Sequence, residues 1–157
     1  KVKFREGFRP FAPSILKEKS KEWFDLNLDS PYMLLVTKIK ESKLVPHDDT
    51  NIVGLNKLKI IRSVVPAITH VNLTARVQTI EKNQNELYYK LIKKFEEITG
   101  CPILINTSFN IKDEPIVCSP EDAFGCFLIS DIDYLVMGNY LLKKEDQHHK
   151  NNLKFLK

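Results

Sequence analysis

The stretch NELYYKLIKKFEEITGCPILIN, residues 85–106, holds the two clearest secondary-structure signals of the chain. Its apolar residues recur every three or four positions, which predicts a helix over 86–99 with an asparagine before it as N-cap. Gly100 can end that helix, because glycine readily adopts the left-handed conformation. The apolar residues from 102 to 105 then predict a short buried strand that delivers Asn106 to a polar loop. A helix followed by a buried strand indicates a mixed α/β structure.

The remaining chain continues this alternation. Prolines favour an extended segment over 9–13, and a serine followed by proline and two acids predicts a helix that starts at Ser119. The other predicted elements are strands over 32–39, 64–68, 75–80 and 133–137, a helix from Ser20 (as N-cap) to Phe24, a loop over 47–56 and a turn at Gly138-Asn139. The predicted fold class is therefore α/β (α+β), a single domain whose twisted mixed sheet is flanked by helices.

Composition and charge are those of an ordinary globular domain. The chain has 157 residues, 43% of them hydrophobic and 28% charged, which is enough to form one core. Much of the small net charge of +4 comes from lysines after residue 142. We therefore expect a domain over 1–142 and a basic, flexible tail over 143–157, and the small charge gives little support to nucleic-acid binding.

Several classes of protein are disfavoured. Three cysteines without C-x-x-C spacing do not indicate a disulfide framework or a zinc site, and no H-x-x-x-H motif predicts a resident metal. No apolar run is long enough to span a bilayer, and no signal peptide opens the chain. We expect a cytoplasmic protein without a membrane partner. The chain starts at Lys1 rather than Met, so we expect a piece of a longer polypeptide.

The segment KFREGFRPFAP, residues 3–13, is rich in cations. In an extended segment Lys3, Arg5 and Arg9 lie on one side, with aromatic residues on the other. Three cations on one face suit a ligand that carries several phosphate charges. The alternative is a basic edge strand in which an arginine pairs with Glu6.

The segment THVNLTARVQT, residues 69–79, is polar between apolar flanks. Arg76 and Gln78 face the same way if this segment is a strand. His70 is a candidate proton carrier or polar contact, although a single histidine beside a strand is more often structural.

The segment NTSFN, residues 106–110, directly follows the predicted buried strand. Loops at strand ends are where α/β folds place ligands, and short amide and hydroxyl side chains can bind a phosphate, a ribose or a carbamoyl group. The alternative is a turn in which these side chains satisfy the backbone. Neither G-x-x-x-x-G-K-[ST] nor G-x-G-x-x-G occurs in the chain.

At these segments, over residues 1–142, the chain resembles the O-carbamoyltransferase family that includes nodulation-factor, cephamycin and tobramycin carbamoylating enzymes. The matching strings are KFREGFRPFAP (3–13), PAITH (66–70), TARVQT (74–79), NTSFN (106–110) and EPIVCSPEDA (114–123). The C-terminal half of these enzymes is similar to the YrdC-like fold of threonylcarbamoyl-adenylate synthases. Lys3-x-Arg5 and Thr107-Ser108-x-Asn110 look like that superfamily's Lys-x-Arg and Ser-x-Asn elements.

The resemblance implies a transferase of a biosynthetic process that acts in two stages. The YrdC-like domain would use carbamoyl phosphate and ATP, with Mg²⁺, to form carbamoyl-adenylate. A separate N-terminal domain would then transfer the carbamoyl group to a hydroxyl acceptor, so this chain alone is not expected to complete the transfer. The alternatives are a non-catalytic interaction domain of such an enzyme and a basic RNA-binding module.

The resemblance also implies roles for individual residues. The residues expected to act in catalysis are Lys3, Arg5, Arg76 and Ser108. Those expected to bind substrate or nucleotide are Arg9, Thr69, His70, Gln78, Asn106, Thr107 and Asn110; no metal ligand is expected. The chain departs from the family at Asn72-Leu73, where Asp-Gly is usual, and a turn that needs a positive φ is restricted without the glycine.

Overall fold

The computed structural model describes residues 3, 6, 8–48 and 50–147. The chain divides into two compact units. Residues 7–107 form what we call the sheet unit, and residues 1–6 with 108–157 form the hairpin unit. Each unit is described by itself.

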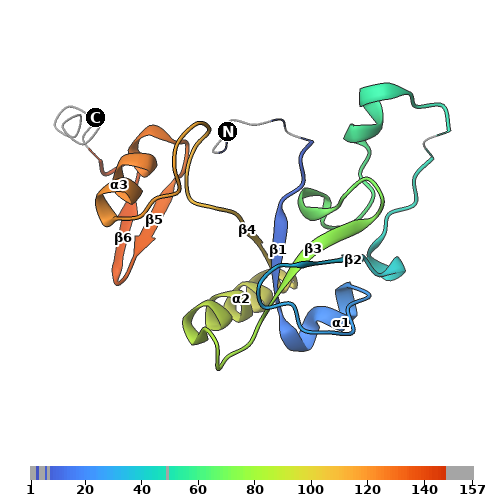
Figure 1. Ribbon diagram of the computed structural model, residues 1–157, viewed down its shortest axis with the longest axis horizontal. Helices are drawn as coiled ribbons and strands as arrows, with labels where there is room; N and C mark the ends of the chain where they lie inside the picture. The colour runs from blue at the N-terminus through green and yellow to red at the C-terminus, as the bar shows by residue number, and fades with distance from the viewer. Residues whose placement is uncertain (1–2, 4–5, 7, 49, 148–157) are drawn as a thin grey trace. The chain divides into compact units, whose positions relative to one another are not determined.

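The sheet unit is built on four strands in the order β2-β3-β1-β4 (Figure 1). Their bounds are Ala12–Leu16 for β1, Leu35–Lys38 for β2, Thr74–Ile80 for β3 and Ile103–Asn106 for β4. β1 runs parallel to β3 and antiparallel to β4, and β2 runs antiparallel to β3. The predicted mixed sheet and the α/β fold class are confirmed.

The two faces of this sheet cover separate hydrophobic clusters. Ile15 and Val77 belong to a cluster with Trp23 and Phe24, and Phe24 is 1% exposed. The neighbouring residue on β1, Leu16, belongs to the other cluster, which also contains Ile80 and Ile92. Because side chains alternate along a strand, Ser14, Gln78 and Asn106 share the face of Leu16 and Ile80.

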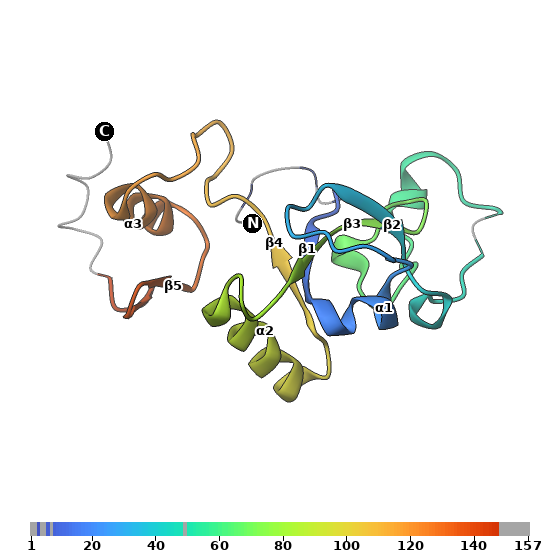
Figure 2. The ribbon, with the colours of Figure 1, turned by 60° about the horizontal axis from the view of Figure 1, so that its bottom comes forward.

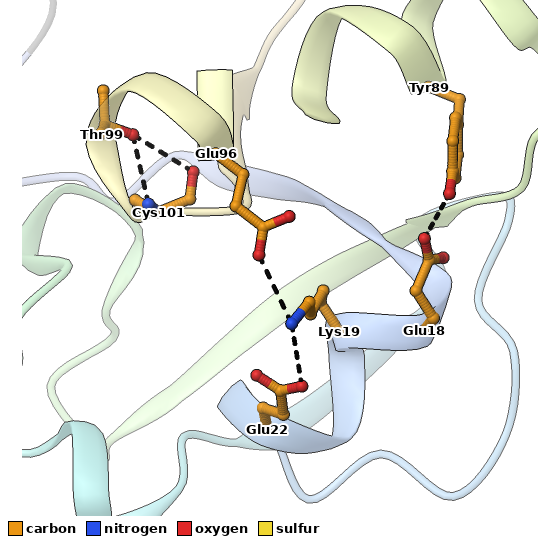
Figure 3. A network of polar contacts seen from close by, with 7 residues as sticks. All are labelled: Glu18, Lys19, Glu22, Tyr89, Glu96, Thr99 and Cys101. Carbon is orange, nitrogen blue, oxygen red and sulfur yellow. Dashed lines mark hydrogen bonds and ion pairs between the residues drawn. The ribbon is translucent and has the colours of Figure 1, made fainter. Parts of the chain in front are cut away.

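The helix α2 (Glu86–Thr99) covers this second face and confirms the predicted helix (Figure 1, Figure 2). The side chain of Asn85 accepts a hydrogen bond from the amide of Tyr88 at 3.1 Å, and Gly100 ends the helix at φ 75°. Figure 3 shows how polar contacts hold α2 to the segment after β1. Lys19 Nζ lies 3.6 Å from a carboxylate oxygen of Glu96, and the hydroxyl of Tyr89 donates to Glu18.

Shorter elements complete the sheet unit. They are α1 (Ser20–Trp23) and the 3-10 helices η1 (Lys17–Lys19), η2 (Glu41–Lys43), η3 (Gly54–Lys59) and η4 (Pro66–Ile68). The predicted strand over 64–68 is therefore wrong. Nearby side chains form hydrogen bonds with its backbone in place of a neighbouring strand. The hydroxyl of Ser63 accepts from the amide of Val65, and the hydroxyl of Thr69 donates to the carbonyl of Val65.

Three other predictions need correction. Ser20 begins α1 as its first residue instead of capping it, and its hydroxyl donates to the carbonyl of Lys17 at 2.7 Å. The strand predicted over 32–39 is shortened to β2, because Met33 takes a left-handed φ of 57°. The loop predicted over 47–56 ends in η3.

The hairpin unit contains α3 (Pro120–Ile129), β5 (Tyr134–Met137) and β6 (Tyr140–Lys143). Ser119 and Asp122 form a reciprocal capping box at the start of α3, as the sequence predicts for a helix that begins here. The two strands pair around the predicted turn at Gly138-Asn139, and the sequence did not predict β6. The unit's core gathers around Phe127, which is fully buried.

The first residues of the predicted tail, which was expected over 143–157, have defined contacts in the hairpin unit. Lys143 ends β6, and Lys144 Nζ donates to the carbonyls of Phe127 and Leu128 in the last turn of α3. Residues 148–157 lie outside the described residues, and the domain boundary at 142 stays a prediction. Within the described residues no helix is both long and apolar enough to cross a membrane.

Candidate functional site

In the hairpin unit, one ammonium group brings together residues of two segments singled out in the sequence, 3–13 and 106–110. Lys3 Nζ donates to the carbonyl oxygens of Ser108 at 2.7 Å and Asn110 at 2.9 Å. It also donates to Ser108 Oγ at 3.2 Å and Asn110 Oδ1 at 2.7 Å, across more than a hundred residues of chain. We call these three residues the Lys3 cluster.

The Lys3 cluster holds its residues in fixed orientations. Ser108 Oγ donates to Asn110 Oδ1 at 2.7 Å, and the Asn110 amide donates to the carbonyl of Glu114 at 2.9 Å. These four oxygens belong to neutral groups, and they orient the ammonium of Lys3. The predicted partner Arg5 lies outside the described residues.

In the sheet unit, Gln78 on β3 is the centre of a second polar cluster. Its Oε1 accepts from Ser14 Oγ at 2.8 Å and from Asn106 Nδ2 at 2.6 Å. Its Nε2 donates to the carbonyl of Pro31 at 2.9 Å. We call Ser14, Gln78 and Asn106 the amide cluster; it joins the second predicted segment to the third.

The amide cluster lies against a cavity of about 500 Å³. Two tyrosines, the exposed Tyr32 and the half-buried Tyr88, line it together with Gln78 and Asn106, and no described residue of the lining is charged. Asn106 Oδ1 accepts no hydrogen bond within the described part of the chain. Aromatic rings and amides suit a neutral planar group.

His70 is held in one tautomer by a relay of hydrogen bonds. The hydroxyl proton of Thr74 is donated to Asn72 Oδ1 at 2.7 Å, so Thr74 Oγ1 can only accept from His70 Nδ1, which lies 2.9 Å away. The neutral ring therefore carries its proton on Nδ1 and leaves Nε2 as an acceptor. Burial, and secondly the charge of Arg76, lowers the pKa of His70 below its usual 6.5.

The turn at Asn72-Leu73, where the chain departs from the family, has the conformation that glycine favours. Leu73 has a left-handed φ of 63°. The turn is fixed by two backbone hydrogen bonds, from the amide of Leu73 to the carbonyl of His70 and from the amide of Ile39 to the carbonyl of Leu73. The backbone thus keeps a conformation that favours glycine, although a leucine occupies it.

Arg76 lies on the same face of β3 as Gln78, as predicted, with its side chain exposed. It makes no hydrogen bond or ion pair to any other described residue. An exposed guanidinium with no partner in the described chain is available to an anion. Thr107, also predicted, is exposed and its hydroxyl makes no hydrogen bond within the same described ranges.

Arg9 and Thr69, which the sequence assigns to the first and second segments, line one cavity of about 380 Å³ in the sheet unit. Two cations that the sequence analysis did not select, Lys59 and Arg62, also line it. A signal for Arg62 existed, because it is a lone charge inside the apolar run IIRSVV, residues 60–65. Thr69 has structural contacts too, since its hydroxyl lies 2.6 Å from Ser63 Oγ.

Among the described residues no three His, Cys, Asp or Glu side chains gather as a metal site would require. The structure thus places predicted residues in three groups: the Lys3 cluster, the amide cluster, and the cavity of Arg9 and Thr69. Each group joins segments that are distant in sequence.

Comparison with known proteins supports the family resemblance over nearly the same residues. The family described as Carbamoyltransferase C-terminus matches residues 1–144. An uncharacterized protein of Synechocystis sp. is 49% identical over 149 residues, covering 94% of this chain and 24% of that protein. Nodulation protein NolNO of Sinorhizobium fredii is 44% identical over 146 residues, and nodulation protein NolO of Bradyrhizobium diazoefficiens is 42% identical over 146. Each covers 91% of this chain, which spans only 19% and 23% of their lengths.

Proposed function

The chain belongs to the carbamoyltransferase C-terminal family, and on that premise we propose that it forms carbamoyl-adenylate from carbamoyl phosphate and ATP. ATP would enter as its Mg²⁺ complex. The carbamoyl group would then pass to a hydroxyl acceptor on a separate N-terminal domain. The chain spans about a quarter or less of its curated relatives, which leaves length for such a domain in those proteins.

The proposed reaction consumes one water molecule. Carbamoyl phosphate and water give carbamate and phosphate. A carbamate oxygen then bonds to the α-phosphorus of ATP, while the bond from that phosphorus to the pyrophosphate oxygen breaks and pyrophosphate leaves. Both substrates are polyanions, so the protein's main tasks are to bring them together and to offset their repulsion.

The observation that carries the proposal is the Lys3 cluster. The resemblance assigns a lysine and a Ser-x-Asn pair to one site, and four oxygens of Ser108 and Asn110 lie within hydrogen-bond distance of Lys3 Nζ. The four neutral oxygens fix the position of the Lys3 ammonium, and a lysine ammonium is a group that binds phosphate oxygens in proteins.

Residues of the sheet unit support the same chemistry in different ways. Arg76 offers a planar guanidinium to an anion, and His70 presents a neutral acceptor nitrogen that can receive a proton. The uncharged cavity beside the amide cluster suits the adenine ring, for which the tyrosines offer stacking and the amides offer hydrogen bonds. These assignments are part of the proposal.

Thermal unfolding with ligands tests the proposal. Two ligands are tested separately: ATP with Mg²⁺, and carbamoyl phosphate. At a hundredfold excess over its Kd, each should stabilise the chain by about 2.7 kcal/mol. Arg76→Ala should lose much of this ligand-induced shift and keep the midpoint of the free protein, because Arg76 is exposed and makes no hydrogen bond or ion pair in the described chain. Lys21→Ala, an exposed cation of α1, is the matched control and should behave as wild type.

The outcomes separate the alternatives. If neither ligand shifts the wild type, the chain is the non-catalytic interaction domain and the proposal fails. If RNA stabilises the chain with steep salt dependence while both small ligands do not, the basic RNA-binding function takes its place.

A further inference from the structure

Three cations line the cavity to which Arg9 and Thr69 belong. These cations are Arg9, Lys59 and Arg62, and none of the described residues that line the cavity is acidic. Apolar walls from Phe11 and Ala67 are joined by a backbone hydrogen bond of 2.8 Å from the amide of Phe11 to the carbonyl of Ala67. The cavity is therefore positive, and two of its walls are fixed to each other.

Arg62 is the unusual member of this lining. It is only 7% exposed, although a guanidinium is always charged. Its Nη1 donates to the carbonyl of Ile60 at 3.1 Å and its Nη2 to the carbonyl of Lys57 at 2.7 Å. Within the described chain no carboxylate pairs with it.

A buried cation with this set of partners is incompletely satisfied. A guanidinium has five N–H donors, and two are used by the carbonyl oxygens. Burying a charge is costly unless an opposite charge and hydrogen bonds compensate it, and carbonyl dipoles supply only part of that compensation. An anion in the cavity would supply the rest, because Arg62 is itself part of the lining.

From this arrangement we propose that the cavity is a binding site for a phosphate group and that Arg62 is its buried anchor. Lys59, which is exposed, adds a second charge at the rim, and a planar guanidinium can bind two oxygens of one phosphate. This inference rests on the proposed function, which supplies two phosphorylated ligands: carbamoyl phosphate and ATP. The guanidinium of Arg62 is held in place by two carbonyls, that of Lys57 in η3 and that of Ile60 directly after η3.

Titration calorimetry with inorganic phosphate and pyrophosphate tests the site on the full chain. Arg62→Met should weaken pyrophosphate binding at least tenfold, and Lys59→Met should weaken it about threefold to fivefold. Arg62→Lys keeps a charge without the planar fork and should give an intermediate loss. Lys93→Met removes an exposed cation of α2 that does not line the cavity, so it should bind as wild type.

Lys59→Met tests phosphate binding separately from any effect of Arg62 on folding. Because Lys59 is exposed and makes no hydrogen bond or ion pair in the described chain, its replacement should leave the thermal midpoint unchanged. If Arg62→Met does not fold, Arg62→Lys and Lys59→Met decide the question. Wild-type affinity for pyrophosphate in those variants, or no binding of either phosphate compound by the wild type, would overturn the site.

Competition identifies which phosphate the cavity holds. If carbamoyl phosphate displaces inorganic phosphate and adenosine does not, the cavity takes the phosphoryl group of the donor. If ATP with Mg²⁺ displaces it instead, the cavity takes the nucleotide's phosphates. Phosphate binding that depends on Arg62, in a chain that releases no pyrophosphate from ATP, would uphold the site and refute the proposed function.

Discussion

Replacing Gln78 with leucine should weaken the sheet unit substantially. The substitution removes three hydrogen bonds, to Ser14, Asn106 and Pro31. Each contributes about 0.5–1.5 kcal/mol net, so the expected loss is about 2–4 kcal/mol in the free energy of unfolding. The upper part of that range is favoured because Ser14 is fully buried and its hydroxyl would be left without an acceptor.

Urea unfolding followed by tryptophan fluorescence measures this loss directly. Trp23 is the single tryptophan of the chain, and it is 8% exposed within the cluster on the opposite face of the sheet. With a slope of about 2 kcal/mol/M, the urea midpoint should fall by about 1–2 M. A double-mutant cycle with Ser14→Ala should give a coupling of about 1 kcal/mol between the two side chains.

The control for Gln78→Leu is Gln84→Leu. Gln84 lines the same cavity, but it is exposed and its side chain makes no hydrogen bond within the described chain. Its replacement should change the stability by less than about 0.5 kcal/mol. Equal losses for the two variants, or a loss below about 0.5 kcal/mol for Gln78→Leu, would refute the role given to the amide cluster.

Three further predictions concern single positions. At Leu73, whose φ is 63°, Leu73→Gly should be more stable than Leu73→Ala by about 0.5–1 kcal/mol in urea unfolding, and the reverse order would show that the turn is not left-handed. Because burial and the charge of Arg76 lower the pKa of His70, the unfolded chain binds a proton first as the pH falls below about 6.5. The stability that neutral His70 contributes to folding is therefore fully present above that pH and is lost as the pH falls. His70→Gln should lose less stability than wild type between pH 8 and 5. A pKa of His70 above 6.5, measured by NMR, would contradict this prediction. Lys144→Met removes donors to two carbonyls at the end of α3 and should cost about 1 kcal/mol, seen as faster amide hydrogen exchange in α3, whereas Lys143→Met should leave exchange unchanged.

Local signals predicted the helices better than the strands. Asn85, Gly100 and Ser119 act within a few residues of their own positions, and the structure contains the helix boundaries that they indicate. The strand predicted over 64–68 is wrong because Ser63 and Thr69 bind its backbone, a competition that an apolar pattern does not show. β1 was predicted only as an extended segment over 9–13, since its pairing depends on strands more than fifty residues away.

The sequence grouped some candidate residues correctly but did not indicate how they meet. That Arg76 and Gln78 share a face follows from the alternation of β3 alone. The contact of Gln78 with Ser14 requires the parallel pairing of β1 and β3, and the contact of Lys3 with Ser108 joins residues 105 positions apart. Arg62 is a lone charge in an apolar run, but the cavity that it lines could not be predicted from that pattern.

The central claim is that this chain activates a carbamoyl group with ATP, and release of pyrophosphate tests it most directly. We predict that the chain, given ATP and Mg²⁺, releases pyrophosphate only when carbamoyl phosphate is present, and that Arg76→Ala abolishes this release. Pyrophosphate release that ignores carbamoyl phosphate, or no release from a chain that both ligands stabilise, would contradict the account.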